Sequence, residues 1–371
     1  MNILRRPTPL DISATAAGVT SPRPDGRPSG RGDLWPRLLM GCGALTLVSL
    51  LALALGPAGI PLDATVRILL SHLPGVHLAG DLPATWRDIV WEVRLPRLLL
   101  AGLVGATLAM AGATYQGVFR NPLAEPYLIG VATGAALGST IVVVAGLSVA
   151  WHGLSLLPLA AFAGALGSVL LVYGVARVGN TVPTTTLVLA GVAVASLSTA
   201  VTSFLMLKST THMFTVFSVV LGGFNTASWV KLGWAVPYVL PAAIVVLVHG
   251  RILNVLNLDE EQARQLGIDV ERTKLLLLGA SSLAAAAAVS VSGTIGFVGL
   301  IVPHAVRLVW GPDNRHLLPM TIIVGAAFLI AADLVARTVD QPSEVPVGIV
   351  TAFCGVPFFL YLLRRARGAY W

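Results

Sequence analysis

Long uncharged stretches alternate with short charged segments along most of the chain. A bilayer core needs about 20 mostly apolar residues per helix, and four of the stretches each suit one such helix. They lie between Arg37 and Asp63, between Arg97 and Arg120, between Lys231 and Arg251, and between Glu344 and Arg364. The pattern therefore predicts a single transmembrane helix at each of these four places.

Three longer uncharged gaps contain clusters of Pro, Gly, Ser or Thr, which interrupt helices. The gap 125–177 divides at 151–153 and Pro158 into two helices, and the gap 177–208 holds one helix after the polar residues 181–186. The gap 274–307 is broken at 290–294, which leaves one full helix and a short one that starts near Gly296. A further span runs from Leu317 to about Arg337, and the short apolar segment 211–224 is expected to form a partial helix in an external loop.

These stretches predict an all-α, polytopic membrane protein with about ten transmembrane helices. An even number of helices places both termini on one side of the membrane, and most of the 24 Lys and Arg residues then lie on that side. Because cytoplasmic loops carry an excess of Lys and Arg, both termini are predicted to be cytoplasmic. Residues 1–36, rich in Pro, Ser, Gly, Thr and Arg, are expected to form a disordered basic tail before a transmembrane domain at 37–371.

The composition excludes several other classes of protein. Of the 371 residues, 56% are hydrophobic and 11% are charged, whereas about a quarter of an ordinary soluble domain is charged. A soluble enzyme and a disordered chain are therefore excluded, and a total of two cysteines excludes a disulfide-stapled secreted domain. The net charge of +7 is attributed to orientation in the lipid bilayer, and no nucleic-acid partner is expected.

The longest predicted cytoplasmic loop runs from Arg251 to Lys274. Asp259 can cap a short helix that Gly267 ends, and a second short helix can begin at Asp269. Short helices at 257–272 suit the docking of a soluble partner. A solvated loop without a partner is an equally good reading of the spacing alone.

The titratable residues give little sign of catalysis. No Gly-Lys pair is present in the sequence, so the chain has no phosphate-binding loop and cannot be an ATPase alone. An intramembrane enzyme would need clustered His, Asp, Glu or Ser at membrane depth, and the predicted spans contain no such cluster. Asp333 is the acid placed within a predicted span, and Arg337, one turn away, can pair with it. We expect no enzyme activity, cofactor or metal site.

Several motifs follow one another in a characteristic order. They are Arg94-Leu95-Pro96-Arg97, Asn121 to Pro126, Ala263 to Gly267, Gly293 to His304, Ala332 to Arg337, and Glu344 to Gly348. Together they resemble the permease subunits of type II ABC importers for iron chelates, haem and cobalamin, from about residue 40 to the C-terminus. One departure is Phe217, where many members have Trp, and another is Gly222-Gly223, a pair less usual in siderophore permeases.

The resemblance implies a type II ABC importer permease fold, with ten helices per subunit, in a bacterial plasma membrane. It implies a homodimer or close heterodimer with its pore on the two-fold axis, two copies of a separate ABC ATPase, and an extracytoplasmic solute-binding protein. Among substrates, an iron(III)-siderophore is expected first, cobalamin or another corrinoid next, and haem third. An ion-coupled secondary transporter remains the alternative, although it would need an acid at mid-membrane.

The resemblance also implies roles for three groups of residues. It assigns docking of the binding protein to Arg94, Arg97 and Arg337, which the predicted topology places outside. The simpler alternatives are that Arg94 and Arg97 snorkel to the membrane interface and that Arg337 pairs with Asp333. It assigns a cytoplasmic gate to Asn121, Leu123 and Thr184, which lie at helix ends near the cytoplasm. An ordinary Asn-Pro turn at Asn121 and an N-cap at Thr184 are equally good explanations of these residues. Coupling to the ATPase is assigned to Asp259, Glu260, Ala263, Arg264, Gln265, Leu266 and Gly267.

Overall fold

The computed structural model describes residues 34–56, 58–72, 80–147, 150–151, 154–179, 181–208, 213–257, 260–341 and 343–367. Most of the expected N-terminal tail, residues 1–33, lies outside this range. Seven described helices are long and apolar enough to cross a membrane. They are α1 (Leu34–Ala54), α4 (Leu95–Phe119), α6 (Leu156–Ala176), α7 (Thr184–Lys208), α9 (Trp229–Val248), α12 (Val270–Ser292) and α14 (Asn314–Ala336).

Three shorter apolar helices complete the predicted set: α5 (Val131–Val144), α13 (Val298–Trp310) and α15 (Val347–Arg367). Each predicted span thus corresponds to one helix, and the prediction of about ten is confirmed. The second span is longer than predicted, because α3 (Ala84–Asp88) and the π-helical turn η3 (Ile89–Arg94) extend α4 without a break.

Short elements connect the long helices. The partial helix expected at 211–224 is confirmed as α8 (Met213–Leu221), and α2 (Leu62–Leu70) follows α1. The remaining short helices are η4 (Pro126–Ile129), α10 (Gly250–Leu256) and α11 (Glu260–Gln265). Two strands of two residues each, β1 (Ala150–Trp151) and β2 (Leu154–Ser155), pair antiparallel at the predicted break between α5 and α6.

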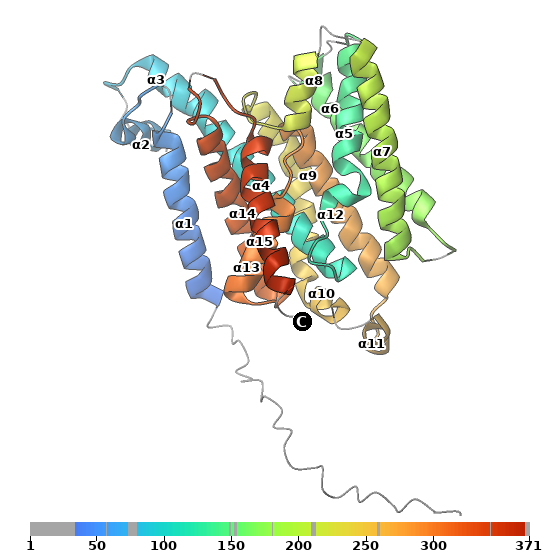
Figure 1. Cartoon of the computed structure of the whole chain (residues 1–371). Helices are drawn as coiled ribbons and strands as arrows, with labels where there is room; N and C mark the ends of the chain where they lie inside the picture. Colours follow the sequence, from blue (N-terminus) through green and yellow to red (C-terminus); the bar gives the residue numbers. More distant parts are fainter. Residues whose placement is uncertain are drawn as a thin grey trace, which may run out of the picture.

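The helices form a bundle around α4 and α12, which are mostly buried, whereas α1 is mostly exposed at one edge beside α14 (Figure 1). The beginning of α1 and the end of α15 lie at the same end of the bundle as α10 and α11, and α2, α3 and α8 lie at the other end (Figure 1). This arrangement agrees with an even number of spans.

One predicted element is wrong. Asp269 does not begin a second short helix, because its carboxylate accepts a hydrogen bond of 3.1 Å from the Arg272 amide and caps the 23-residue helix α12. A capping residue marks where a helix starts but says nothing of its length. The predicted range 257–272 therefore contains α11 and the first turn of a spanning helix.

Small residues allow the central helices to approach closely, as is common in membranes. Gly164 on α6 and Gly134 on α5 face each other so tightly that a Cβ atom at Gly164 would lie 2.2 Å from the Gly134 carbonyl oxygen. Gly112 on α4 likewise touches Gly299 on α13, where an added Cβ atom would lie 1.9 Å from the carbonyl oxygen. The absence of side chains at these positions determines the helix spacing.

Three helix ends, with the segments next to them, meet at one place, which we call the loop junction: the end of α8 and the residues after it (219–224), the end of α12 and the segment before α13 (292–297), and the segment that leads into α15 (344–348). The amide of Gly223 donates to the Ser292 carbonyl (2.8 Å), and that of Thr294 donates to the Val219 carbonyl (3.0 Å). The amide of Val347 donates to the Gly222 carbonyl (3.1 Å). Since lipid offers no hydrogen-bond partners, each interruption satisfies backbone groups of another.

We predict that Gly164→Ala destabilises the protein, whereas Gly167→Ala on the same helix does not. Overpacking of this kind costs about 1–3 kcal/mol, and an added Cβ atom at Gly167 meets no atom within 4 Å. The measurement is the melting temperature of the detergent-purified variants. Equal melting temperatures would contradict the contact between α5 and α6.

Candidate functional site

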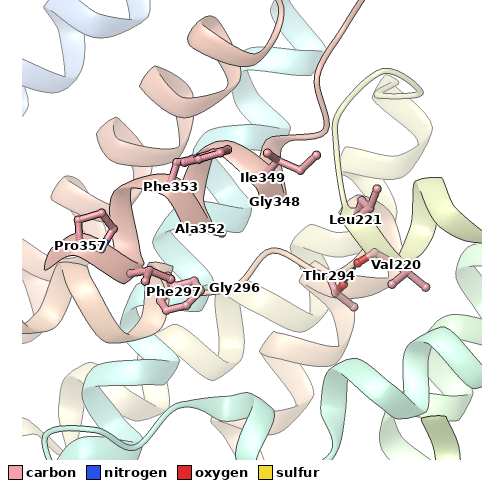
Figure 2. Close-up of a pocket in the computed structure, with 11 residues that line it drawn as sticks. Val220, Leu221, Thr294, Gly296, Phe297, Gly348, Ile349, Ala352, Phe353 and Pro357 are labelled. Atoms are coloured by element: carbon pink, nitrogen blue, oxygen red, sulfur yellow. Dashed lines mark hydrogen bonds between the residues drawn. The ribbon is translucent and has the colours of Figure 1, made fainter. Parts of the chain in front are cut away.

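Two neighbouring cavities flank the loop junction. One, of ≈ 620 Å³, lies between α5, α7 and α8, and the other, of ≈ 590 Å³, lies between α8, the segment after α12, and α15 (Figure 2). Val220 and Thr294 line both cavities. The junction that satisfies the broken helices is therefore also the partition between the two cavities.

The cavity walls are apolar with a few hydroxyl groups. Thr133, Thr199, Thr202 and Ser203 contribute hydroxyls to the larger cavity, and no charged residue is among the described residues that line either one. The Thr202 hydroxyl has no hydrogen-bond partner in the described part of the chain. Such walls can hold a large, mostly apolar solute with a few polar groups at its rim.

Phe297 separates the smaller cavity from α13. Its backbone is left-handed, with φ 68°, which is uncommon outside glycine and persists where the surroundings fix it. Its ring packs on Gly355 of α15, where an added Cβ atom would lie 2.4 Å from the ring. Figure 2 shows Phe297 and Phe353 on the α15 side of the cavity, with Val220, Leu221 and Thr294 across from them. The positions of α13 and α15 are thus linked through one aromatic ring.

A network of ion pairs, which we call the arginine cluster, lies at the end of the bundle that carries α2 and α3. The Arg97 guanidinium forks onto Asp333, with Nε at 3.0 and 3.1 Å from the two carboxylate oxygens and Nη2 at 2.9 Å from Oδ1. The same guanidinium donates to both oxygens of Glu344, at 2.9 and 3.0 Å. One arginine of α4 therefore holds α14 and the loop that leads into α15.

Arg94 and Arg337 complete the cluster on the side of α1. Arg94 Nη1 donates to the carbonyls of Leu53 (2.5 Å) and Ala54 (3.3 Å), and Arg337 Nη2 donates to the Ala52 carbonyl. These carbonyls belong to the C-terminal turn of α1, where a helix has unpaired acceptors and partial negative charge. Arg94 and Arg337 are only 5% and 7% exposed, so both side chains are buried against the end of α1.

The structure brings together the three arginines that the motifs predicted, but with different partners. The predicted pair of Arg337 and Asp333 exists at 3.8 Å, yet the main partner of Asp333 is Arg97. Sequence reasoning missed the bonds from Arg97 to Asp333 and Glu344, which lie 236 and 247 positions away. Glu344, whose side chain is 39% exposed, is the most accessible member among the ion-paired groups of the cluster.

The three residues predicted to form a gate lie near one end of α4 and α7. The Asn121 side chain accepts a hydrogen bond of 2.9 Å from the Leu123 amide, in a turn that directly follows α4. Thr184 is the first residue of α7 and lines a small crevice with Phe119. Asn121 and Leu123 do not line that crevice, so the structure does not join all three residues in one constriction.

Glu125 lies in the same loop, immediately before η4. It is half-buried, and desolvation raises the pKa of its carboxyl to about 7. Its side chain makes no capping hydrogen bond to η4. It is therefore a loop carboxyl that changes charge near neutral pH.

The predicted coupling residues form a compact turn around α11. Gly267 has φ 81° and ends the helix, with its amide 2.9 Å from the Arg264 carbonyl. Ala263 is fully buried, whereas Leu266 is 68% exposed. Gln265 is exposed, Glu260 is the first residue of the helix, and Asp259 lies outside the described residues. The turn thus presents an apolar side chain at the end of the bundle where both described chain ends lie.

Comparisons with known proteins all indicate transport permeases. The family model described as the FecCD transport family matches residues 44–365. The chain is 45% identical to the cobalamin import system permease protein BtuC of Halobacterium salinarum, covering 86% of this chain and 89% of that protein. It is 39% identical to the hemin transport system permease protein HmuU of Yersinia pestis, covering 91% and 98%.

Two further similar proteins are a permease with a different named substrate and a solved transporter structure. The molybdate import system permease protein MolB of Haemophilus influenzae is 33% identical, covering 90% of this chain and 98% of that protein. A solved inward-facing conformation of a metal-chelate type ABC transporter has a TM-score of 0.76 and 31% identity, covering 88% of this chain and 98% of that one. The predicted fold class is confirmed.

We predict that Asp333→Asn destabilises the protein strongly, whereas Asp340→Asn has little effect. Both changes remove one negative charge, but Asp333 is buried between two guanidinium groups and Asp340 is exposed on the following turn. Removing one partner of a buried ion pair costs on the order of 3 kcal/mol. Thermal unfolding of the two variants measures the difference, and equal stability would show that Asp333 is not needed to hold the arginine cluster.

Proposed function

The chain belongs to the FecCD transport family, and from this premise we propose that it forms the membrane passage of an ATP-driven importer for a large organic metal chelate. A corrinoid is the first candidate substrate, and an iron(III)-siderophore, which the family resemblance placed first, is the second. The observation that carries the proposal is the pair of uncharged cavities that meet at Val220 and Thr294. The family consists of transport permeases, and ATP hydrolysis is assigned to a separate subunit.

The lining of the cavities supports an organic chelate over an inorganic oxyanion. A small oxyanion is bound through charged or strong hydrogen-bond donors, and the described cavity walls offer aromatic, aliphatic and hydroxyl groups instead. The relative of 45% identity is named for cobalamin import, which favours a corrinoid over haem. A molybdate substrate, named for one relative, fits this lining poorly.

An ion-coupled secondary transporter is not favoured. Such a transporter needs an acid that can gain and lose an ion or proton within the membrane. Asp333, the acid predicted within a span, is held by Arg97 and lies 3.8 Å from Arg337. A carboxylate whose negative charge is balanced by two neighbouring guanidinium groups is poorly suited to carry a proton.

A second copy of the chain is proposed to close the passage. Phe353, in the wall of the smaller cavity, is 77% exposed, and Leu207, in the wall of the larger one, is also largely exposed. In a lone subunit these walls would open sideways to lipid, where a chelate with polar groups would lose its hydration. A homodimer with α7, α8 and α15 of each copy facing the two-fold axis avoids this cost.

The two ends of the bundle are assigned to two soluble partners. The turn of α11, from Asp259 to Gly267, is proposed to contact one ATPase subunit per permease copy, on the cytoplasmic side with both termini. Asn121, Leu123 and Thr184 are proposed to close the passage at that side. The opposite face, with Arg94, Arg97 and Arg337, is proposed to receive the solute-binding protein, with Arg94 and Arg337 supporting the face from within.

The substrate is tested by uptake into proteoliposomes that contain the permease, its ATPase and the solute-binding protein encoded beside this chain. We expect ATP-dependent accumulation of a labelled corrinoid, weaker or no accumulation of a ferric siderophore, and none of molybdate. Accumulation driven by an ion gradient without ATP would overturn the proposed function. A preference for the ferric siderophore would reverse only the order of substrates.

Coupling is tested by placing a charge on the exposed turn. Leu266→Asp should weaken the association of the ATPase by about 30-fold, the size of effect typical of a central interface residue. Val339→Asp is the matched control, because Val339 is 69% exposed at the opposite end of the bundle. Co-purification of the ATPase with each detergent-solubilised variant measures the difference. Unchanged co-purification of the Leu266 variant would remove this turn from the interface.

A further inference from the structure

The arginine cluster contains two carboxylates on a single guanidinium, and they differ in exposure. Asp333 is buried and also lies near Arg337, whereas the side chain of Glu344 is 39% exposed and contacts Arg97 from the outer edge. A solvated ion pair contributes little to stability, whereas a buried one is costly to break. Glu344 is therefore the group that another carboxylate could replace on Arg97.

A route to Arg97 exists beside Glu344. A crevice of ≈ 60 Å³ is lined by Arg97, Glu344 and the residues on either side of them in space, Gly222 to Asn225 and Val345 to Val347. This volume equals about two water molecules. It can admit the end of an acidic side chain but not a chelate.

The segment that carries Glu344 leads directly into the cavity wall. The amide of Val345 donates to the Ala336 carbonyl (3.0 Å), and the amide of Val347 donates to the Gly222 carbonyl (3.1 Å). Gly348 packs on the Leu221 carbonyl, where an added Cβ atom would lie 2.2 Å from the oxygen, and it lines the smaller cavity. Three residues, 345–347, therefore separate the outer ion pair from the cavity wall at Gly348.

We propose that Glu344 is a displaceable internal anion: an acidic side chain of the docked solute-binding protein replaces it on Arg97, and its release loosens the beginning of α15. The inference rests on the proposed function, because it needs such a partner. It adds a mechanism by which arrival of the partner at the outer face reaches the wall of the cavity. The charge of the cluster is unchanged by the exchange, since one carboxylate leaves Arg97 as another arrives.

The first test uses the purified chain without any partner. Glu344→Gln keeps the shape of the side chain and removes its charge, and Asp340→Asn is the control with the same change of charge on the same loop. Hydrogen–deuterium exchange should become faster in peptides that cover 343–353 in the Glu344 variant but not in the control. Unchanged exchange in a variant with wild-type melting behaviour would overturn the proposal.

The second test uses the complete complex in lipid nanodiscs with the solute-binding protein encoded beside this chain. Glu344→Gln should bind that protein about two- to fivefold more tightly at low salt, the range expected for one exposed ion pair. It should also raise the ATPase rate in the absence of the binding protein and reduce the stimulation that the binding protein causes. Behaviour identical to that of Asp340→Asn would reject the exchange alone. A wild-type complex that does not capture the binding protein would reject the proposed function with it.

Discussion

Backbone amide and carbonyl groups must be satisfied within the protein wherever lipid surrounds it, and this constraint determines where the cavities lie. The chain breaks its helices after α8, between α12 and α13, and before α15, and each break alone would leave such groups unpaired. Their hydrogen bonds to one another, from Gly223 to Ser292 and from Val347 to Gly222, remove the cost. Because Thr294 and Val220 take part in the same junction and line both cavities, the positions of the two cavities follow from the way in which the broken helices satisfy their backbone groups.

The end of the bundle that carries α2 and α3 follows the same rule with charges in place of backbone groups. Three guanidinium groups face only two carboxylates, so the cluster needs a further source of negative potential. The last carbonyls of α1, at Ala52, Leu53 and Ala54, provide it. A helix that is otherwise mostly exposed is thereby fixed to the bundle at one end. Glu344 is the most solvent-exposed of the ion-paired groups in the arginine cluster. It is therefore the carboxylate that another anion can most easily replace.

The sequence predicts what depends on local pattern. Charge-free stretches give the spans, and the glycine at 267 gives the end of α11, because length and backbone freedom act within a few residues. The pairing of Arg97 with Asp333 and Glu344 could not be predicted, since it depends on how α4, α14 and α15 pack. The cavities could not be predicted for the same reason. In the sequence Thr199 and Thr202 are ordinary helix residues, and only the packing of α5 and α8 against α7 makes them part of a cavity wall. The error at Asp269 has another origin, because capping chemistry is the same for a short helix and for a spanning one.

One helix joins the end of the bundle that carries α11 to the loop junction. α12 begins at the Asp269 cap, directly after the turn of α11, and ends at Ser292, whose carbonyl accepts the Gly223 amide. At 23 residues it is about 35 Å long, and its buried, alanine-rich middle leaves little room for bending. A single continuous helix therefore connects the α11 turn with the partition between the two cavities. The arginine cluster is connected to the same partition through the four residues after Glu344, so elements from both ends of the bundle meet at one small set of backbone hydrogen bonds.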